Sequence, residues 1–125
     1  MNRPRSLAEV VERSTTPRAF QYALVEFLDQ FAIEQRADML SAEPARIVAD
    51  LPFGVADAYL AAVAVSLART IGAAPPAWAW APSRKLTRPW FAHPGAALRA
   101  TLLLESPGPF RERNLFVSAN ALSRA

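Results

Sequence analysis

The chain has 125 residues, a formal net charge of +3, 52% hydrophobic and 20% charged residues, and no cysteine. This composition is close to the globular average and excludes a disordered or low-complexity chain, while the length suits one domain with its own core. The lack of cysteine excludes disulfides, thiolate metal sites and a cysteine nucleophile, and is typical of a cytoplasmic protein.

The first part of the chain carries two helix-start signals. Ser6 and Glu9 form a capping-box pattern, which predicts a short helix over residues 6–14. Thr16-Pro17 predicts a second start, because threonine caps free amides and proline suits the first helical position. An apolar face then predicts a long helix to about Leu40. That face comprises Phe20, Leu24, Phe27, Leu28 and Phe31.

The next segments predict a short helix followed by a central one. Ser41–Pro44 is a further helix start, and we expect that helix to end near Leu51. Residues 55–71 are rich in alanine, with Asp57 and Arg69 as the only charges. Small residues around most of the circumference predict that other elements approach this helix closely. Its apolar run is shorter than the ~18–20 residues that cross a membrane.

Prolines prevent a regular helix through most of residues 72–94. The same segment contains Trp78, Trp80, Trp90 and Phe91, whose aromatic area is more stable when it is buried. We therefore expect an ordered loop that packs on the helices, and not a flexible linker.

The C-terminal part predicts one more helix and a short extended segment. Residues 96–105 favour a helix over a buried strand, and residues 115–117 have extended character. Ser118 is placed to cap a last turn through Leu122. The expected fold is a mainly α, single-domain helical bundle over residues 1–125, with about four to six helices and a long ordered loop rich in proline and tryptophan.

The chain has few residues that could take part in catalysis, phosphate binding or metal binding. His93 is the only histidine and reads most simply as a loop residue, so imidazole metal sites and Ser-His-Asp hydrolysis are poorly supported. The four glycines form no phosphate loop or dinucleotide fingerprint. The acids of the long helix lack the Glu-x-x-His pattern of bundle metal sites and favour a solvated face. We expect no catalysis, no cofactor and no metal.

Nucleic-acid signals are weak. No expected helix is a polar, basic helix linked by a turn to a second one, so we expect no specific duplex recognition. Residues 84–90 interleave basic and aromatic side chains as a single-strand binder does, but a tryptophan buried beneath a solvated loop is favoured.

Charge is distributed unevenly along the chain. Residues 1–83 hold seven arginines and nine acids, a balance of −2, whereas residues 84–125 hold seven basic residues and two acids, a balance of +5. Within the basic part, Arg111 and Arg113 flank Glu112. Either Glu105 and Glu112 pair with these arginines in a structural network, or the arginines bind a partner. The candidate partner-binding residues are Arg88, Trp90, Phe91, Arg111, Arg113 and Asn114.

Several segments carry a resemblance to a known group of proteins. They are residues 27–31, 76–78, 88–91, 105–107, 110–117 and 120–125. Over roughly residues 17–125 the chain resembles a group of small uncharacterised bacterial proteins that are often encoded beside a nucleotidyltransferase-fold protein. The resemblance implies the antitoxin-like half of a toxin–antitoxin pair, and it supplies no catalytic residues.

These observations together predict a non-catalytic protein-binding module in the cytoplasm. The expected partner is the product of the adjacent gene, with no membrane and no specific nucleic acid, and self-association stays open. The alternatives are a DNA-binding transcriptional regulator and a structural subunit.

Overall fold

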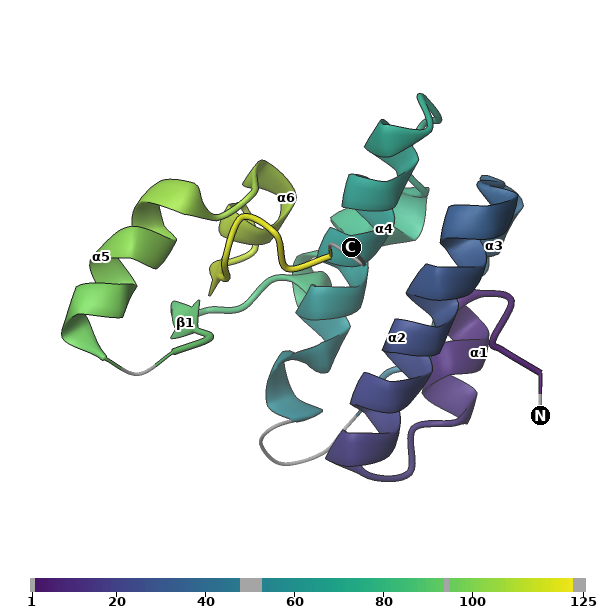
Figure 1. Cartoon of the computed structure of the whole chain (residues 1–125), viewed down its shortest axis with the longest axis horizontal. Coiled ribbons are helices and arrows are strands. Elements are labelled where there is room, and N and C mark those ends of the chain that lie inside the picture. The colour runs from purple at the N-terminus through teal and green to yellow at the C-terminus, as the bar shows by residue number, and fades with distance from the viewer. Residues whose placement is uncertain (1, 48–52, 94, 123–125) are drawn as a thin grey trace.

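The computed structural model describes residues 2–47, 53–93 and 95–122. Across these ranges the chain forms six α-helices, three short 3₁₀ turns and a ribbon of two strands. Figure 1 shows α1, α2 and α3 on one side, α4 in the middle, and α5 with the ribbon on the other side. The expected mainly α bundle with a long ordered loop is confirmed.

The first two helices begin where the sequence predicts. The hydroxyl of Ser6 accepts from the Glu9 amide at 3.1 Å and begins α1 (Leu7–Glu12). Thr16 likewise accepts from the Ala19 amide at 3.0 Å and begins α2 (Pro17–Glu34). The capping signals therefore have their expected physical effect.

The expected extension of the second helix to Leu40 is wrong. Gln35 takes a left-handed conformation with φ 49°, and its amide donates to the Phe31 carbonyl at 2.8 Å, which ends α2. A separate short helix, α3 (Asp38–Ser41), follows and buries Met39 and Leu40. The left-handed residue turns the chain so that these two side chains reach the core.

The expected third helix is also wrong where it can be compared. Residues 43–47 are not helical, while Leu51 and its neighbours lie outside the described ranges. The carbonyl of Pro44 accepts from Arg84 at 2.6 Å, and the amide of Ile47 donates to Asp57 at 3.0 Å. Distant side chains thus satisfy the backbone groups that a helix would have paired.

The central helix α4 (Ala56–Thr70) follows a 3₁₀ turn, η1 (Phe53–Val55). Its alanines and valines are buried almost all round, and the core side chains of α1 and α2 pack in the same cluster. The turns η2 (Ala77–Trp80) and η3 (Pro82–Arg84) and the helix α6 (Gly108–Arg111) lie against it. Across the described ranges, no helix combines the length and apolarity that a membrane crossing requires.

The loop after α4 ends in the ribbon. β1 (Trp90–Phe91) pairs in parallel with β2 (Leu115–Phe116), Trp90 opposite Leu115. The helix α5 (Ala96–Glu105) lies in the crossover between them, because parallel neighbours require a long connection. The helical interpretation of residues 96–105 and the extended one of 115–116 are confirmed.

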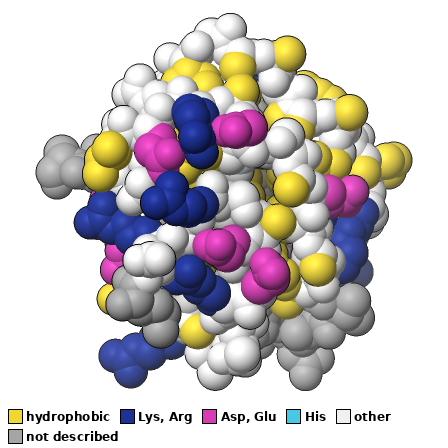
Figure 2. All heavy atoms as spheres, turned by 90° about the vertical axis from the view of Figure 1, so that its right-hand side faces the viewer, with side chains coloured by type: hydrophobic (Ala, Val, Ile, Leu, Met, Phe, Trp, Pro, Cys, Tyr) yellow, Lys and Arg dark blue, Asp and Glu magenta, His cyan; other side chains and the backbone are white. Residues whose placement is uncertain are grey.

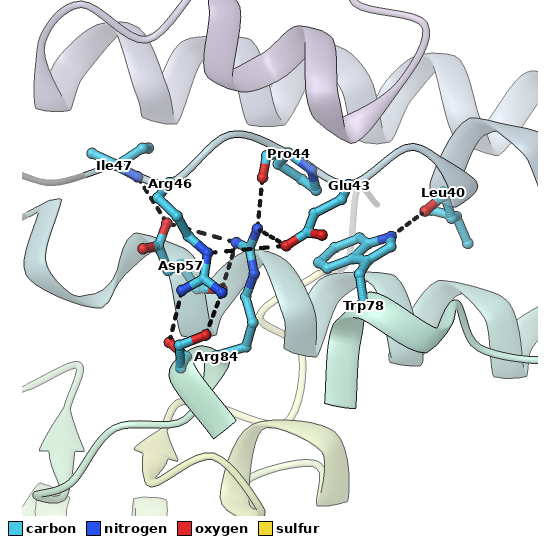
Figure 3. Close-up of polar contacts among 9 residues, drawn as sticks. Leu40, Glu43, Pro44, Arg46, Ile47, Asp57, Trp78 and Arg84 are labelled. Carbon is cyan, nitrogen blue, oxygen red and sulfur yellow. Dashed lines mark hydrogen bonds and ion pairs between the residues drawn. The ribbon is translucent and has the colours of Figure 1, made fainter. Parts of the chain in front are cut away.

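A buried arginine ties this loop to the helices (Figure 3). The Arg84 side chain is 0% exposed, and one nitrogen donates to the Pro44 carbonyl while contacting the Glu43 carboxylate at 3.2 Å. Its other terminal nitrogen lies 3.6 Å from Asp57. The guanidinium also lies 5.0 Å from the ring centre of Trp78, whose indole donates to the Leu40 carbonyl at 3.0 Å. The segment is ordered, as its aromatic content predicts.

Candidate protein-binding site

The turn η2 presents one tryptophan to the core and one to solvent. A 3₁₀ helix has three residues per turn, so two side chains separated by one residue point in different directions. Trp78 packs against the core, whereas Trp80 is 52% exposed. Half of a large aromatic surface is therefore available at a fixed position.

Arg113 lies beneath the exposed ring. Its guanidinium carbon is 5.0 Å from the ring centre of Trp80, and the residue is 4% exposed. Its two terminal nitrogens donate to the carbonyls of Pro109 at 2.8 Å and Ala79 at 2.9 Å. Burial lowers the pKa of Arg113 from its ordinary value, and Glu112 acts in the opposite direction. The arginine thus supports the ring of Trp80 from a rigid position.

A small cleft of about 110 Å³ lies beside this pair. Trp80, Lys85 and Glu112 contribute to its walls. Lys85 and Arg88 are exposed, and their side chains make no hydrogen bond or ion pair with any residue that the structure describes. The tryptophan therefore stands beside one cation, Lys85, that is available to a partner.

The ribbon gathers three of the residues predicted from sequence. The Trp90 amide donates to the Asn114 carbonyl at 2.8 Å, and Phe91 stacks on Phe116 with ring centres 4.9 Å apart. Asn114 adopts φ 63°, and its side-chain amide donates to the Leu86 carbonyl at 2.6 Å. Trp90 and Phe91 are half-buried, so part of each ring faces outward.

The two arginines around Glu112 have different surroundings. Arg113 is buried, as described above, whereas Arg111 is exposed and donates to the Ser106 carbonyl at 2.6 Å. Glu105 accepts from the Ala119 amide and forms no ion pair with either arginine, and Glu112 lies 3.9 Å from Arg113. Of the expected carboxylate pairs, Glu112 with Arg113 therefore forms and Glu105 with either arginine does not, while backbone carbonyls make the closer contacts to both arginines.

Sequence reasoning missed Trp80 and Lys85. The signal for Trp80 was the spacing of two tryptophans around one alanine in a segment that prolines keep out of α-helix. Such a spacing cannot bury both rings on one face. Lys85 has no comparable signal, because its place beside the ring depends on the turn η3.

On the side of the molecule formed by α1, α2 and α3, basic and acidic side chains lie close together (Figure 2). Arg3 pairs with Glu26 at 3.0 Å, and Glu34 lies 3.5 Å from Arg5 and 3.4 Å from Arg36. A hydrogen bond from Gln30, and then these arginines, lower the pKa of Glu34. The acids of α2 therefore form a solvated, ion-paired face. In the part of the chain that the structure describes, no group of three metal-binding side chains occurs.

A larger apolar groove of about 400 Å³ separates α2 from the C-terminal segment. The only described polar side chains among its lining residues are Gln21, Tyr59, His93 and Ser118. Its walls come from segments far apart in the chain, which explains why the sequence pattern gives no sign of it.

No family model, curated protein or solved structure matches this chain.

Proposed function

We propose that the protein is a non-catalytic protein-binding module that acts in the cytoplasm. Its partner would be the product of the adjacent gene, a nucleotidyltransferase-type toxin that the module neutralises as an antitoxin does. The choice of partner rests on the resemblance described above, and the choice of surface rests on Trp80.

The half-exposed Trp80 on the fixed Arg113 is the observation that carries the proposal. Tryptophan and arginine are enriched among the few residues that dominate binding energy. A ring held in place before binding loses little conformational freedom when a partner covers it. This arrangement suits recognition of an apolar side chain of another protein.

The charges around the ring favour an acidic partner. Lys85 is exposed beside it, and Arg88 and Arg111 are further exposed cations in residues 84–125. Charges at the rim of an interface mainly accelerate association, and added salt weakens that effect.

Association of the purified chain with the neighbouring gene product, measured by calorimetry, tests the proposal. Trp80→Ala is expected to weaken binding about tenfold or more. Lys85→Glu with Arg88→Glu is expected to slow association and to reduce its dependence on salt. Ile33→Ala and Arg18→Glu change an exposed apolar residue and an exposed cation on α2, and both should bind like wild type.

Two results would overturn the proposal. One is a wild-type chain that does not bind the neighbour, and the other is a folded Trp80→Ala variant that binds with unchanged affinity. Nanomolar, sequence-selective duplex binding at physiological salt would instead favour a transcriptional regulator.

A further inference from the structure

A further exposed cation lies near the pair formed by Trp80 and Arg113. Arg69, in the last turn of α4, is exposed and makes no hydrogen bond or ion pair with any residue that the structure describes. Besides burial, the charge of Arg69 lowers the pKa of Arg113, so Arg69 lies near that guanidinium. Lys85 stands in the wall of the cleft beside the same ring. Two exposed cations from distant parts of the chain therefore lie near one exposed tryptophan.

The ion pairs around η2 and η3 leave these two cations uncompensated. The pairs join three arginines to three acids, and their charges cancel. The arginines are Arg46, Arg84 and Arg113, and the acids are Glu43, Asp57 and Glu112. Lys85 and Arg69 come in addition, so this group of side chains has a balance of +2. Such an excess attracts a ligand that carries more than one negative charge.

The exposed ring of Trp80 suits a flat ligand. The guanidinium of Arg113 lies over the ring at 5.0 Å, yet Trp80 remains 52% exposed. The other exposed large apolar side chains among the described residues belong to α2 and α5. The ring is therefore an isolated platform beside cations and not part of a broad apolar patch. Nucleobases stack on such platforms, and because every base has a flat face, the stacking tolerates any sequence.

We propose that this surface binds single-stranded nucleic acid without sequence preference. One base stacks on Trp80, and neighbouring phosphates contact Lys85 and Arg69. A duplex is a poor ligand, because the faces of its bases are covered by their own stacking. The basic and aromatic stretch at residues 84–90 thus contributes a cation to the surface, while the stacking ring comes from outside that stretch. This inference goes beyond the proposed function, and the strand and the protein partner would compete for the same ring.

The expected affinity is modest and depends on salt. Non-specific nucleic-acid binding has dissociation constants of about 10⁻⁴–10⁻⁶ M at physiological salt. One stacked base and two phosphate contacts predict the weak end of this range, about 10⁻⁴ M. Each phosphate contact with a single strand contributes about −0.7 to the slope of log affinity against log salt, so the two cations predict a slope of about −1.4.

Fluorescence anisotropy of a labelled oligothymidylate of about eight nucleotides tests the proposal on the full chain. The matched probe is an abasic strand, which has the same number of phosphates but no bases. Wild type is expected to bind the oligothymidylate about tenfold more tightly than the abasic strand, because only the former can stack on Trp80.

Three substitutions separate stacking from charge. Trp80→Ala should bind the two probes equally, at the affinity of the abasic strand, while Trp80→Phe should keep the preference for bases. Lys85→Gln should reduce the salt slope to about −0.7 and leave that preference intact. Circular dichroism should show that the three variants are folded.

The matched controls lie on α2. Tyr22→Ala removes an aromatic side chain that is 69% exposed, and Arg18→Gln removes an exposed cation. Both variants should bind the oligothymidylate like wild type, because neither residue lies near Trp80 in the cleft.

Three outcomes would overturn the inference. They are a wild-type chain that does not bind the oligothymidylate at low salt, an abasic strand that binds as tightly as the oligothymidylate, and a polyglutamate peptide of equal charge that binds as tightly. The last of these would show that the surface recognises acidic protein and not nucleic acid. No measurement involves the neighbouring gene product, so failure of this inference is distinct from failure of the proposed function.

Discussion

Trp78 and Trp80 have different roles although a single alanine separates them. Trp78 donates to the Leu40 carbonyl and packs on Arg84, whereas half of Trp80 faces solvent. Trp78→Ala is expected to lower the free energy of unfolding by about 2–4 kcal/mol, because it leaves a cavity and an unpaired carbonyl. Trp80→Ala should cost less than about 1.5 kcal/mol. Urea unfolding of both variants measures this difference, and equal losses would contradict it.

Arg84 is the most completely buried charge in the described part of the chain. Arg84→Ala removes a cation that joins three segments and leaves the Pro44 carbonyl without a donor. We expect a loss of about 3 kcal/mol or more in the free energy of unfolding. Glu43→Gln should cost less than about 1 kcal/mol, because Glu43 is half-exposed and water replaces its contact. Thermal unfolding measures both variants, and similar losses of stability for Arg84→Ala and Glu43→Gln would argue against this structural role of Arg84.

Tyr59 should make stability depend on alkaline pH. Burial raises the pKa of Tyr59 above its ordinary value of about 10. The folded chain therefore holds the phenol proton longer than the unfolded chain does. Its contribution to stability is fully present below about pH 10 and is lost as the pH rises through the folded pKa. Urea unfolding between about pH 9 and about pH 11 should show a shallower decline in the free energy of unfolding for Tyr59→Phe than for wild type.

The control for this pH series is Tyr22→Phe. A hydrogen bond to Glu26 and the charge of Glu26 raise the pKa of Tyr22. Ionisation of this largely exposed tyrosine therefore also lowers the free energy of unfolding as the pH rises. The difference between the two variants isolates the buried phenol. An unchanged slope for Tyr59→Phe would contradict the assignment.

At the scale of the elements, the sequence predicts helix starts better than helix ends. The starts of α1 and α2 rely on local capping, which neighbouring residues determine. The end of α2 depends on Gln35, a residue with no local preference for a left-handed backbone. The segment after Ser41 looks like a helix start, but Arg84 and Asp57 hold it extended from the other side of the fold. Contacts between distant segments are not visible in local patterns.

The left-handed cap also gives a stability prediction. Gln35→Gly relieves the strain of a side chain at φ 49° and should raise the free energy of unfolding by about 0.5–1 kcal/mol. Asn114→Gly is the matched comparison, because Asn114 has φ 63° but also donates its side-chain amide to Leu86. That variant should gain nothing. Melting temperatures of the two variants measure the contrast, and a destabilised Gln35→Gly variant would refute it.

For the whole molecule, composition and periodicity were sufficient to predict the mainly α domain and the ordered aromatic loop. They also indicated the basic C-terminal region that contains Arg113 and the ribbon. They could not predict that Arg113 lies under Trp80, or that α2 and the C-terminal segment enclose a groove. Both arrangements depend on how distant segments pack in space, and that packing leaves no regular spacing in the sequence.

The parallel pairing of β1 and β2 also has a consequence for the order of folding. Its two short strands meet only after the chain has closed a loop that contains α5 and α6, and long-range closure costs entropy before it gains contacts. We expect the ribbon to form after the α4 core and to open before it. Native-state hydrogen exchange measures the free energy of the opening that exposes each amide. This opening free energy should be smaller for the amides of Trp90 and Ala92 than for the amide of Val63. Equal protection would contradict this order, and a partner bound at the ribbon should slow the exchange of both amides.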